Sequence, residues 1–209
     1  MQTLRRIMLV CLLLFQCISP LSAQTEERDD FQILENKFKD LGIKTEIAEK
    51  LAEKVLHGEQ LDCMKHEYNS VEPIEITYEN GCFKETYEYP DGSRKIVSIS
   101  AGETQYISGG AYISGGNWYS WKNALVYGSN GIITVSYRAD LAGSAYDGHL
   151  LNVNSLIFAG TVNSFGVFSS DASASNPAAG GLYGIKNGIY VSLLVYVPIG
   201  SSPYAKFNL

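Results

Sequence analysis

The feature that most constrains the fold is an alternation of apolar and polar residues that two turn sequences interrupt. Residues 74–78 alternate, Asn80-Gly81 follows, and residues 83–89 alternate again. Asn-Gly favours the positive φ angles of a type I′ turn, which joins two antiparallel strands. Pro90-Asp91-Gly92 predicts a second turn, into residues 94–100. The pattern predicts a three-stranded antiparallel meander, with one face carrying Ile74, Ile76, Tyr78, Phe83 and Tyr87.

Two helices are predicted ahead of the meander, within residues 30–58. The first places its apolar residues three and four apart, at Phe31, Leu34, Phe38 and Leu41. Gly42 suits its C-terminal cap. The second helix starts at Thr45 and carries a stripe formed by Ile47, Leu51 and Val55. Because two helices of this size do not form a fold alone, the stripes are expected to pack on each other or on a sheet.

The chain after residue 101 has a different composition. Of the 20 glycines, all but Gly42, Gly58, Gly81 and Gly92 lie there. β-like segments, separated by turn clusters, lie at residues 132–139, 150–158, 161–168 and 189–197. The last of these segments is almost entirely apolar, which favours a central strand. Residues 172–181 are small and are predicted to form a mobile rim loop.

These patterns predict a mainly β chain of the α+β class. A leader (1–23), a helical lead (24–66) and a β-meander (67–101) would precede a glycine- and tyrosine-rich antiparallel β-sandwich or small barrel (102–209).

Residues 1–23 read as a signal peptide. Arg5 and Arg6 precede nine apolar residues, and small residues lead up to Ala23. The apolar run is about half of the ~20 residues that span a bilayer. We therefore expect cleavage near Ala23 and secretion, with no stable membrane anchor.

The cysteines and the charge bear on the compartment and the partners. Cys11 and Cys17 leave with the leader, so Cys63 and Cys82 are predicted to form a disulfide. Loss of the two leader arginines leaves 14 basic and 22 acidic residues, a net charge of −8. This balance argues against nucleic acid and anionic membranes as partners.

Three stretches resemble a family of secreted Gram-positive bacterial proteins of unknown function. They are Leu41-Gly-Ile43, the segment from Gly58 to Tyr68 that reads GE..D.M..EY, and Tyr89-Pro-Asp-Gly-Ser93. The family combines a short helical lead, a YPDGS hairpin and a β domain. The resemblance covers roughly residues 40–100 and implies secretion and a Gram-positive source, but no catalytic residue. Cys63 stands where the family pattern suggests serine.

Motifs for catalysis are sparse. The sequence has three histidines, His57, His66 and His149. It lacks a zinc-binding His-Glu-x-x-His, a nucleophile elbow and a phosphate-binding loop, so no catalytic residue, metal or cofactor is predicted. Asp140, Asp147 and His149, near Arg138, form the best constellation for acid–base chemistry, and equally suit a solvated turn.

Aromatic residues crowd residues 106–127. They include Tyr106, Tyr112, Trp118, Tyr119, Trp121 and Tyr127, and the segment contains a tandem Tyr-Ile-Ser-Gly-Gly. Exposed Tyr and Trp can stack on sugars or anchor a protein partner, while the same residues can also fill a core. The segment therefore predicts a non-enzymatic binding module whose ligand is a cell-wall polysaccharide or a surface protein.

Two other functions stay open. A bacteriocin-like or pore-forming effector would insert the apolar strands at residues 132–137 and 189–197 into a membrane. A hydrolase would use Asp147 and His149.

Overall fold

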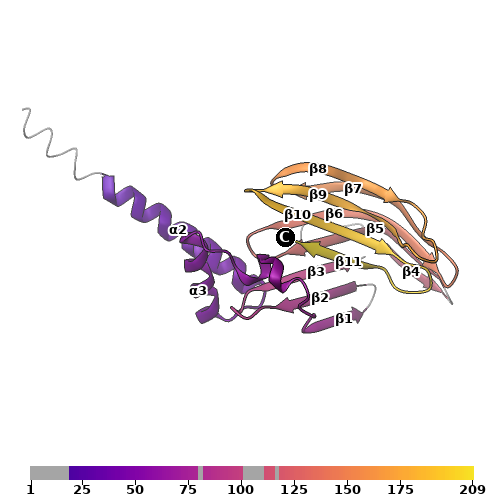
Figure 1. Ribbon diagram of the computed structural model, residues 1–209, viewed down its shortest axis with the longest axis horizontal. Helices are drawn as coiled ribbons and strands as arrows, with labels where there is room; N and C mark the ends of the chain where they lie inside the picture. Colours follow the sequence, from indigo (N-terminus) through magenta and orange to yellow (C-terminus); the bar gives the residue numbers. More distant parts are fainter. Residues whose placement is uncertain (1–18, 80–81, 101–110, 116–117) are drawn as a thin grey trace, which may run out of the picture.

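The chain folds into two antiparallel β-sheets with a helical hairpin at one end (Figure 1). The structure is a computed structural model and describes residues 19–79, 82–100, 111–115 and 118–209. Residues 1–18 of the predicted leader lie outside this range. The predicted mainly β architecture with an antiparallel sandwich is confirmed.

The first sheet has the strand order β1-β2-β3-β5-β6-β7, and β4 pairs with β5. Its strands are β1 (Glu75–Glu79), β2 (Cys82–Glu88), β3 (Arg94–Ser100), β4 (Ala111–Gly115), β5 (Trp118–Ser129), β6 (Thr134–Ser144) and β7 (Gly148–Phe158). The predicted meander is confirmed, with Glu79 opposite Cys82 and Tyr78 opposite Phe83. The change in composition near residue 101 does not separate two sheets, because Ser98 of β3 pairs with Tyr127 of β5.

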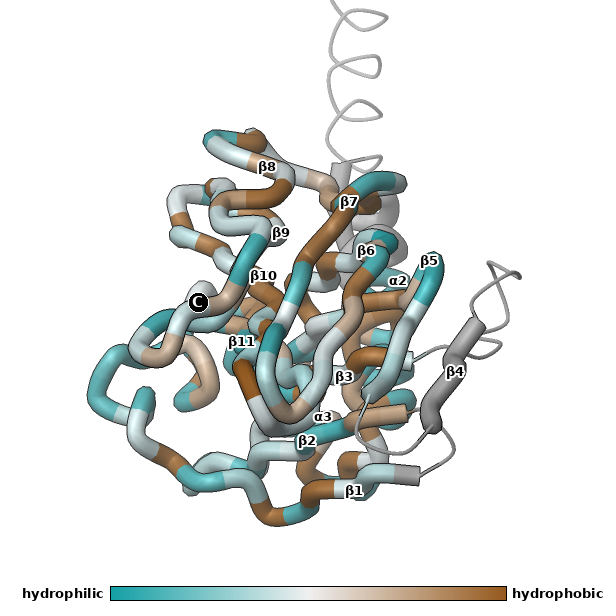
Figure 2. The backbone as a smooth tube through the Cα atoms, turned by 90° about the vertical axis from the view of Figure 1, so that its right-hand side faces the viewer, coloured by the Kyte–Doolittle hydropathy of each residue, from teal (hydrophilic) through white to brown (hydrophobic). Residues whose placement is uncertain are grey.

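The second sheet has the order β11-β10-β9-β8. It comprises β8 (Thr161–Ser169), β9 (Ala178–Lys186), β10 (Ile189–Val197) and β11 (Tyr204–Asn208). The apolar β10 lies between two neighbours, as predicted. The chain crosses between the sheets in the two residues that separate β7 from β8. At the other side β11 lies over β3, and β1 and β2 extend beyond it (Figures 1 and 2).

The small residues at 172–181 do not form a loop throughout, since β9 already begins at Ala178. A Cβ on Gly180 would lie 2.6 Å from the carbonyl oxygen of Gly166, and one on Gly181 would collide with the carbonyl oxygen of Leu193. Only glycine therefore fits at these two positions, where β9 lies close to neighbouring backbone. The small residues that suggest a loop in the sequence instead allow this close strand packing.

The predicted helical hairpin is confirmed. It consists of α2 (Ser19–Asp40) and α3 (Thr45–Leu56), and Gly42 between them has a φ of 76°. The short 3-10 turns η1 (Asp62–Met64) and η2 (His66–Tyr68) lead from the hairpin to the sheet. Phe38 is buried against the 130–133 turn, where a Cβ on Gly131 would lie 2.7 Å from its ring. Within the described residues, neither α2 nor α3 combines the length and the apolar character of a membrane-spanning helix.

The structure corrects the predicted disulfide, because Cys63 and Cys82 are both free thiols. The backbone N–H of Cys63 donates to Ser93 Oγ (3.2 Å), next to the start of β3. Cys82 pairs with Ser100 at the other end of that strand. Ser93 and Ser100 are seven positions apart, which is about 23 Å along a strand, whereas a disulfide needs Cα atoms within ~7 Å.

Candidate functional site

The aromatic side chains predicted to form a binding face lie partly at the surface and partly in the core. The side chain of Trp118 is 50% exposed, whereas Trp121 is fully buried opposite Leu141. Tyr119 is half-buried and its hydroxyl donates to the carbonyl of Ser201 (3.4 Å). Residues three apart in a strand point to opposite faces, so the two tryptophans do not share a surface. The prediction is therefore wrong for Trp121.

Tyr127 is partly buried and pairs with Ser98 of β3, whereas two further members of the predicted face are not placed by the structure. Tyr106 and the side chain of Tyr112 lie outside the described residues. Tyr112 enters the description only through its backbone, which pairs with that of Trp121 in β4 and β5.

Of the predicted acid–base residues, Asp147 lies in the turn between β6 and β7, and His149 lies near the start of β7. His149 Nδ1 is 2.7 Å from Asp171 Oδ1, and its Nε2 is 3.6 Å from Asp147 Oδ2. Hydrogen bonds from Ser170 and His149 lower the pKa of Asp171. Both ring nitrogens thus face carboxylates, and all three side chains are substantially exposed. This geometry agrees better with a hydrogen-bonded surface turn than with a general base directed at a substrate.

Asp140 and Arg138 instead form hydrogen bonds with backbone groups of β5. Asp140 Oδ1 accepts the N–H of Asn123 (2.6 Å), and Arg138 Nη1 donates to the Asn123 carbonyl (2.7 Å). Asn123 has a φ of 52° and lies in the register shift between Trp121 and Ala124. The two charged residues therefore hold a β-bulge. Among the residues with described side chains, no group of three His, Cys, Asp or Glu is placed to hold a metal ion.

Sequence reasoning missed an aromatic surface on the second sheet. We call it the tyrosine face, and it comprises Phe168, Tyr183, Tyr190, Tyr196 and Tyr204. The rings of Phe168 and Tyr183 lie 5.5 Å apart, and those of Tyr196 and Tyr204 stack at 5.0 Å with 16° between their planes. Burial and the neighbouring Tyr183 and Tyr204 raise the pKa of Tyr196, which keeps its hydroxyl protonated.

A groove of about 390 Å³ opens on the tyrosine face. Tyr183 and Tyr190, which are 46% and 74% exposed, line it. Its polar lining comes from Asn163, Ser192 and Asn208, and Asn208 Nδ2 donates to Ser192 Oγ (3.2 Å). No charged side chain is among the described residues that line the groove. Aromatic rings beside a few convergent amide and hydroxyl groups are typical of small-molecule sites.

The signal for this face is present in the sequence but weak. In β10 the buried residues Val191, Leu193 and Val195 alternate with Tyr190, Ser192 and Tyr196. The hydroxyl-bearing residues occupy every second position except Leu194, which is itself buried. The strand looks apolar on both faces when tyrosine is counted among the hydrophobic residue types.

The chain matches no protein-family model, no curated protein and no solved structure.

Proposed function

We propose that this chain is a secreted, non-enzymatic binding protein that recognises a neutral cell-wall polysaccharide through the groove on its tyrosine face. The observation that carries the proposal is the groove itself, in which Tyr183 and Tyr190 stand beside the amides of Asn163 and Asn208. The proposal therefore assigns sugar stacking to tyrosines of the second sheet, and not to residues 106–127 as the sequence predicts.

The chemistry of a saccharide matches this lining. The faces of tyrosine rings bury the apolar C–H side of a pyranose, while a tyrosine loses little conformational entropy on binding. Amide and hydroxyl groups such as those of Asn208 and Ser192 satisfy sugar hydroxyls, which would otherwise lose hydrogen bonds to water. A lining without charged side chains favours a neutral sugar over an anionic one.

Secretion forms part of the proposal and rests on the predicted leader at residues 1–23. The pore-forming alternative receives less support. Val135, Tyr137, Val191 and Val195 are buried between the sheets. Insertion of these strands into a membrane would therefore require the core to open.

Titration of the purified protein with neutral polysaccharides, selected from a glycan array, tests the proposal. Tyr183→Ala and Tyr190→Ala are each expected to weaken binding at least ~10-fold, as for central aromatic residues of interfaces. Tyr146→Ala is the matched control, because Tyr146 is 85% exposed but lies in the turn between β6 and β7. Absence of binding to every neutral glycan, or equal affinity of the Tyr183 and Tyr190 variants, would refute the function.

A further inference from the structure

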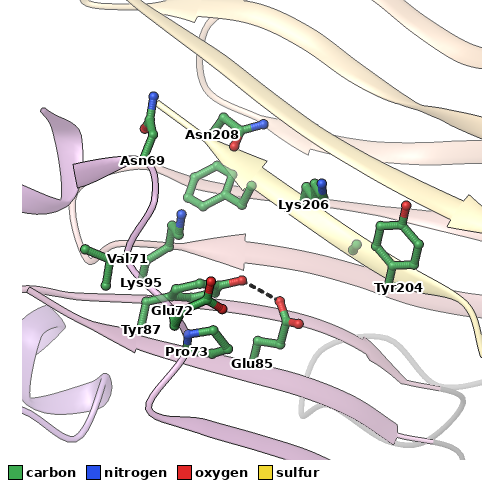
Figure 3. Close-up of a pocket in the computed structure, with 12 residues that line it drawn as sticks. Asn69, Val71, Glu72, Pro73, Glu85, Tyr87, Lys95, Tyr204, Lys206 and Asn208 are labelled. Atoms are coloured by element: carbon green, nitrogen blue, oxygen red, sulfur yellow. Dashed lines mark hydrogen bonds between the residues drawn. The ribbon is translucent and has the colours of Figure 1, made fainter. Parts of the chain in front are cut away.

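A second cavity lies at the seam between the sheets, where β11 passes over β3 and β2 extends beyond it. Figure 3 shows it, with Tyr87, Glu85 and Lys95 contributed by the first sheet and Tyr204, Lys206 and Asn208 by β11. Its volume is about 240 Å³. This is room for several waters, and therefore for one small solute.

Lys95 presents a positive charge to this cavity. It pairs with Tyr87 across β2 and β3, and its Nζ lies 4.5 Å from the centroid of the Tyr87 ring. Among the described residues, no carboxylate lies within 4.0 Å of the ammonium. Burial lowers the pKa of Lys95, which means that its charge is partly desolvated. An anion that enters the cavity would offset that desolvation.

A negative charge stands at the hydroxyl end of the same ring. The Tyr87 hydroxyl donates to Glu85 Oε2 (2.6 Å), as the dashed line in Figure 3 marks. Burial, followed by this hydrogen bond to Glu85, raises the pKa of Tyr87, so the hydroxyl keeps its proton and holds the carboxylate in place. Glu85 Oε1 accepts no hydrogen bond from the described part of the chain. The carboxylate of Glu72 also lines the cavity.

We propose that the cavity binds a free amino acid or an equally small amino-carboxylate, with its carboxylate toward Lys95 and its ammonium toward Glu85. The juxtaposition of an unpaired ammonium and a carboxylate in a cavity of this size carries the inference. It concerns a different cavity from the groove at Tyr183 and Tyr190, although Asn208 lines both, and it does not depend on the glycan function.

Calorimetric titration with a panel of small compounds tests the proposal. Glycine, both enantiomers of alanine and γ-aminobutyrate present both charges. Acetate, methylamine, alaninamide and N-acetylalanine each lack one of them. At least one compound of the first group is expected to bind at least ~10-fold more tightly than its matched analogues.

Lys95→Met and Glu85→Gln are each expected to reduce that binding at least ~10-fold. Lys84→Met is the matched control, because Lys84 lies on the opposite face of β2 from Glu85. The variant Lys95→Met is also expected to raise the melting temperature, since it removes a desolvated charge and keeps an apolar stem. A purely structural lysine stacked on Tyr87 would instead leave Lys95→Met less stable than the parent.

The results separate this site from the proposed glycan site. Tyr183→Ala is expected to retain amino-acid binding, and Lys95→Met is expected to retain glycan binding. The inference is overturned if no amino-carboxylate binds the parent protein at millimolar concentration, or if Lys95→Met binds it as the parent does.

Discussion

Asp62 and Asp91 each accept a hydrogen bond from the other's backbone amide. Asp62 N lies 3.0 Å from Asp91 Oδ2, and Asp91 N lies 3.1 Å from Asp62 Oδ2. Lys65 and Lys54 complete the pair with salt bridges of 2.6 and 2.9 Å to Asp62 and Asp91 respectively. This arrangement joins the segment that leaves the helices to the turn between β2 and β3.

The first prediction concerns the stability that Asp91 provides. Its carboxylate accepts the amides of Asp62 and Ser93 and the ammonium of Lys54. Asp91→Asn removes the charge and one accepting oxygen, so it is expected to lower the free energy of unfolding by about 1–3 kcal/mol. Urea denaturation measures the change, with the exposed Asp40 replaced by Asn as the control. Equal midpoints for both variants would contradict the role of the pair.

The second prediction is a dependence on pH. Burial alone would raise the pKa of Asp91, but hydrogen bonds from Ser93, the Asp62 amide and Lys54 outweigh it and lower the pKa. A lowered folded-state pKa contributes stability above the unfolded value of about 3.9, and this stability is lost as the pH falls through the folded-state value. We expect the parent to lose more stability than Asp91→Asn between pH 5 and 3. If urea denaturation shows that the parent and Asp91→Asn lose equal stability across that range, the pKa of Asp91 does not contribute to stability in this way.

The third prediction concerns the thiols. Burial raises the pKa of Cys63 to about 11, and Asn130 Nδ2 donates to its sulfur (3.6 Å). Cys82 is only half-buried. Alkylation of the native protein is expected to modify Cys82 before Cys63, because the thiolate is the reactive form. A reductant is expected to leave the melting temperature unchanged. A mass two hydrogens below that of the dithiol form would show that a disulfide exists after all.

The fourth prediction separates the two tryptophans. Trp121→Ala empties a fully buried site, so it is expected to cost about 3–5 kcal/mol of stability. Trp118→Ala changes a half-exposed side chain and is expected to stay within about 0.5 kcal/mol of the parent. Fluorescence quenching by iodide reports the same difference: the quenchable signal should disappear in Trp118→Ala. Persistent quenching in that variant would place Trp121 at the surface.

The local elements were determined by the sequence itself. Asn80-Gly81 and Pro90-Asp91-Gly92 predict the meander, and Gly42 with the apolar spacing around Phe38 predicts the helical hairpin. Turn conformation and helical periodicity depend on residues only a few positions apart, so a single sequence carries this information.

Tertiary structure decided which side chains meet and which reach the solvent. Trp118 and Trp121 belong to one aromatic run, yet only the packing of two sheets buries the second. The separation of Cys63 from Cys82 follows from where η1 docks along β3, not from their spacing in the chain. The tyrosine face forms because the register of β9, β10 and β11 places Tyr183 opposite Ser192 and Tyr196 opposite Tyr204. Such pairings form between residues far apart in sequence, and their free energy comes from burial that no local pattern encodes.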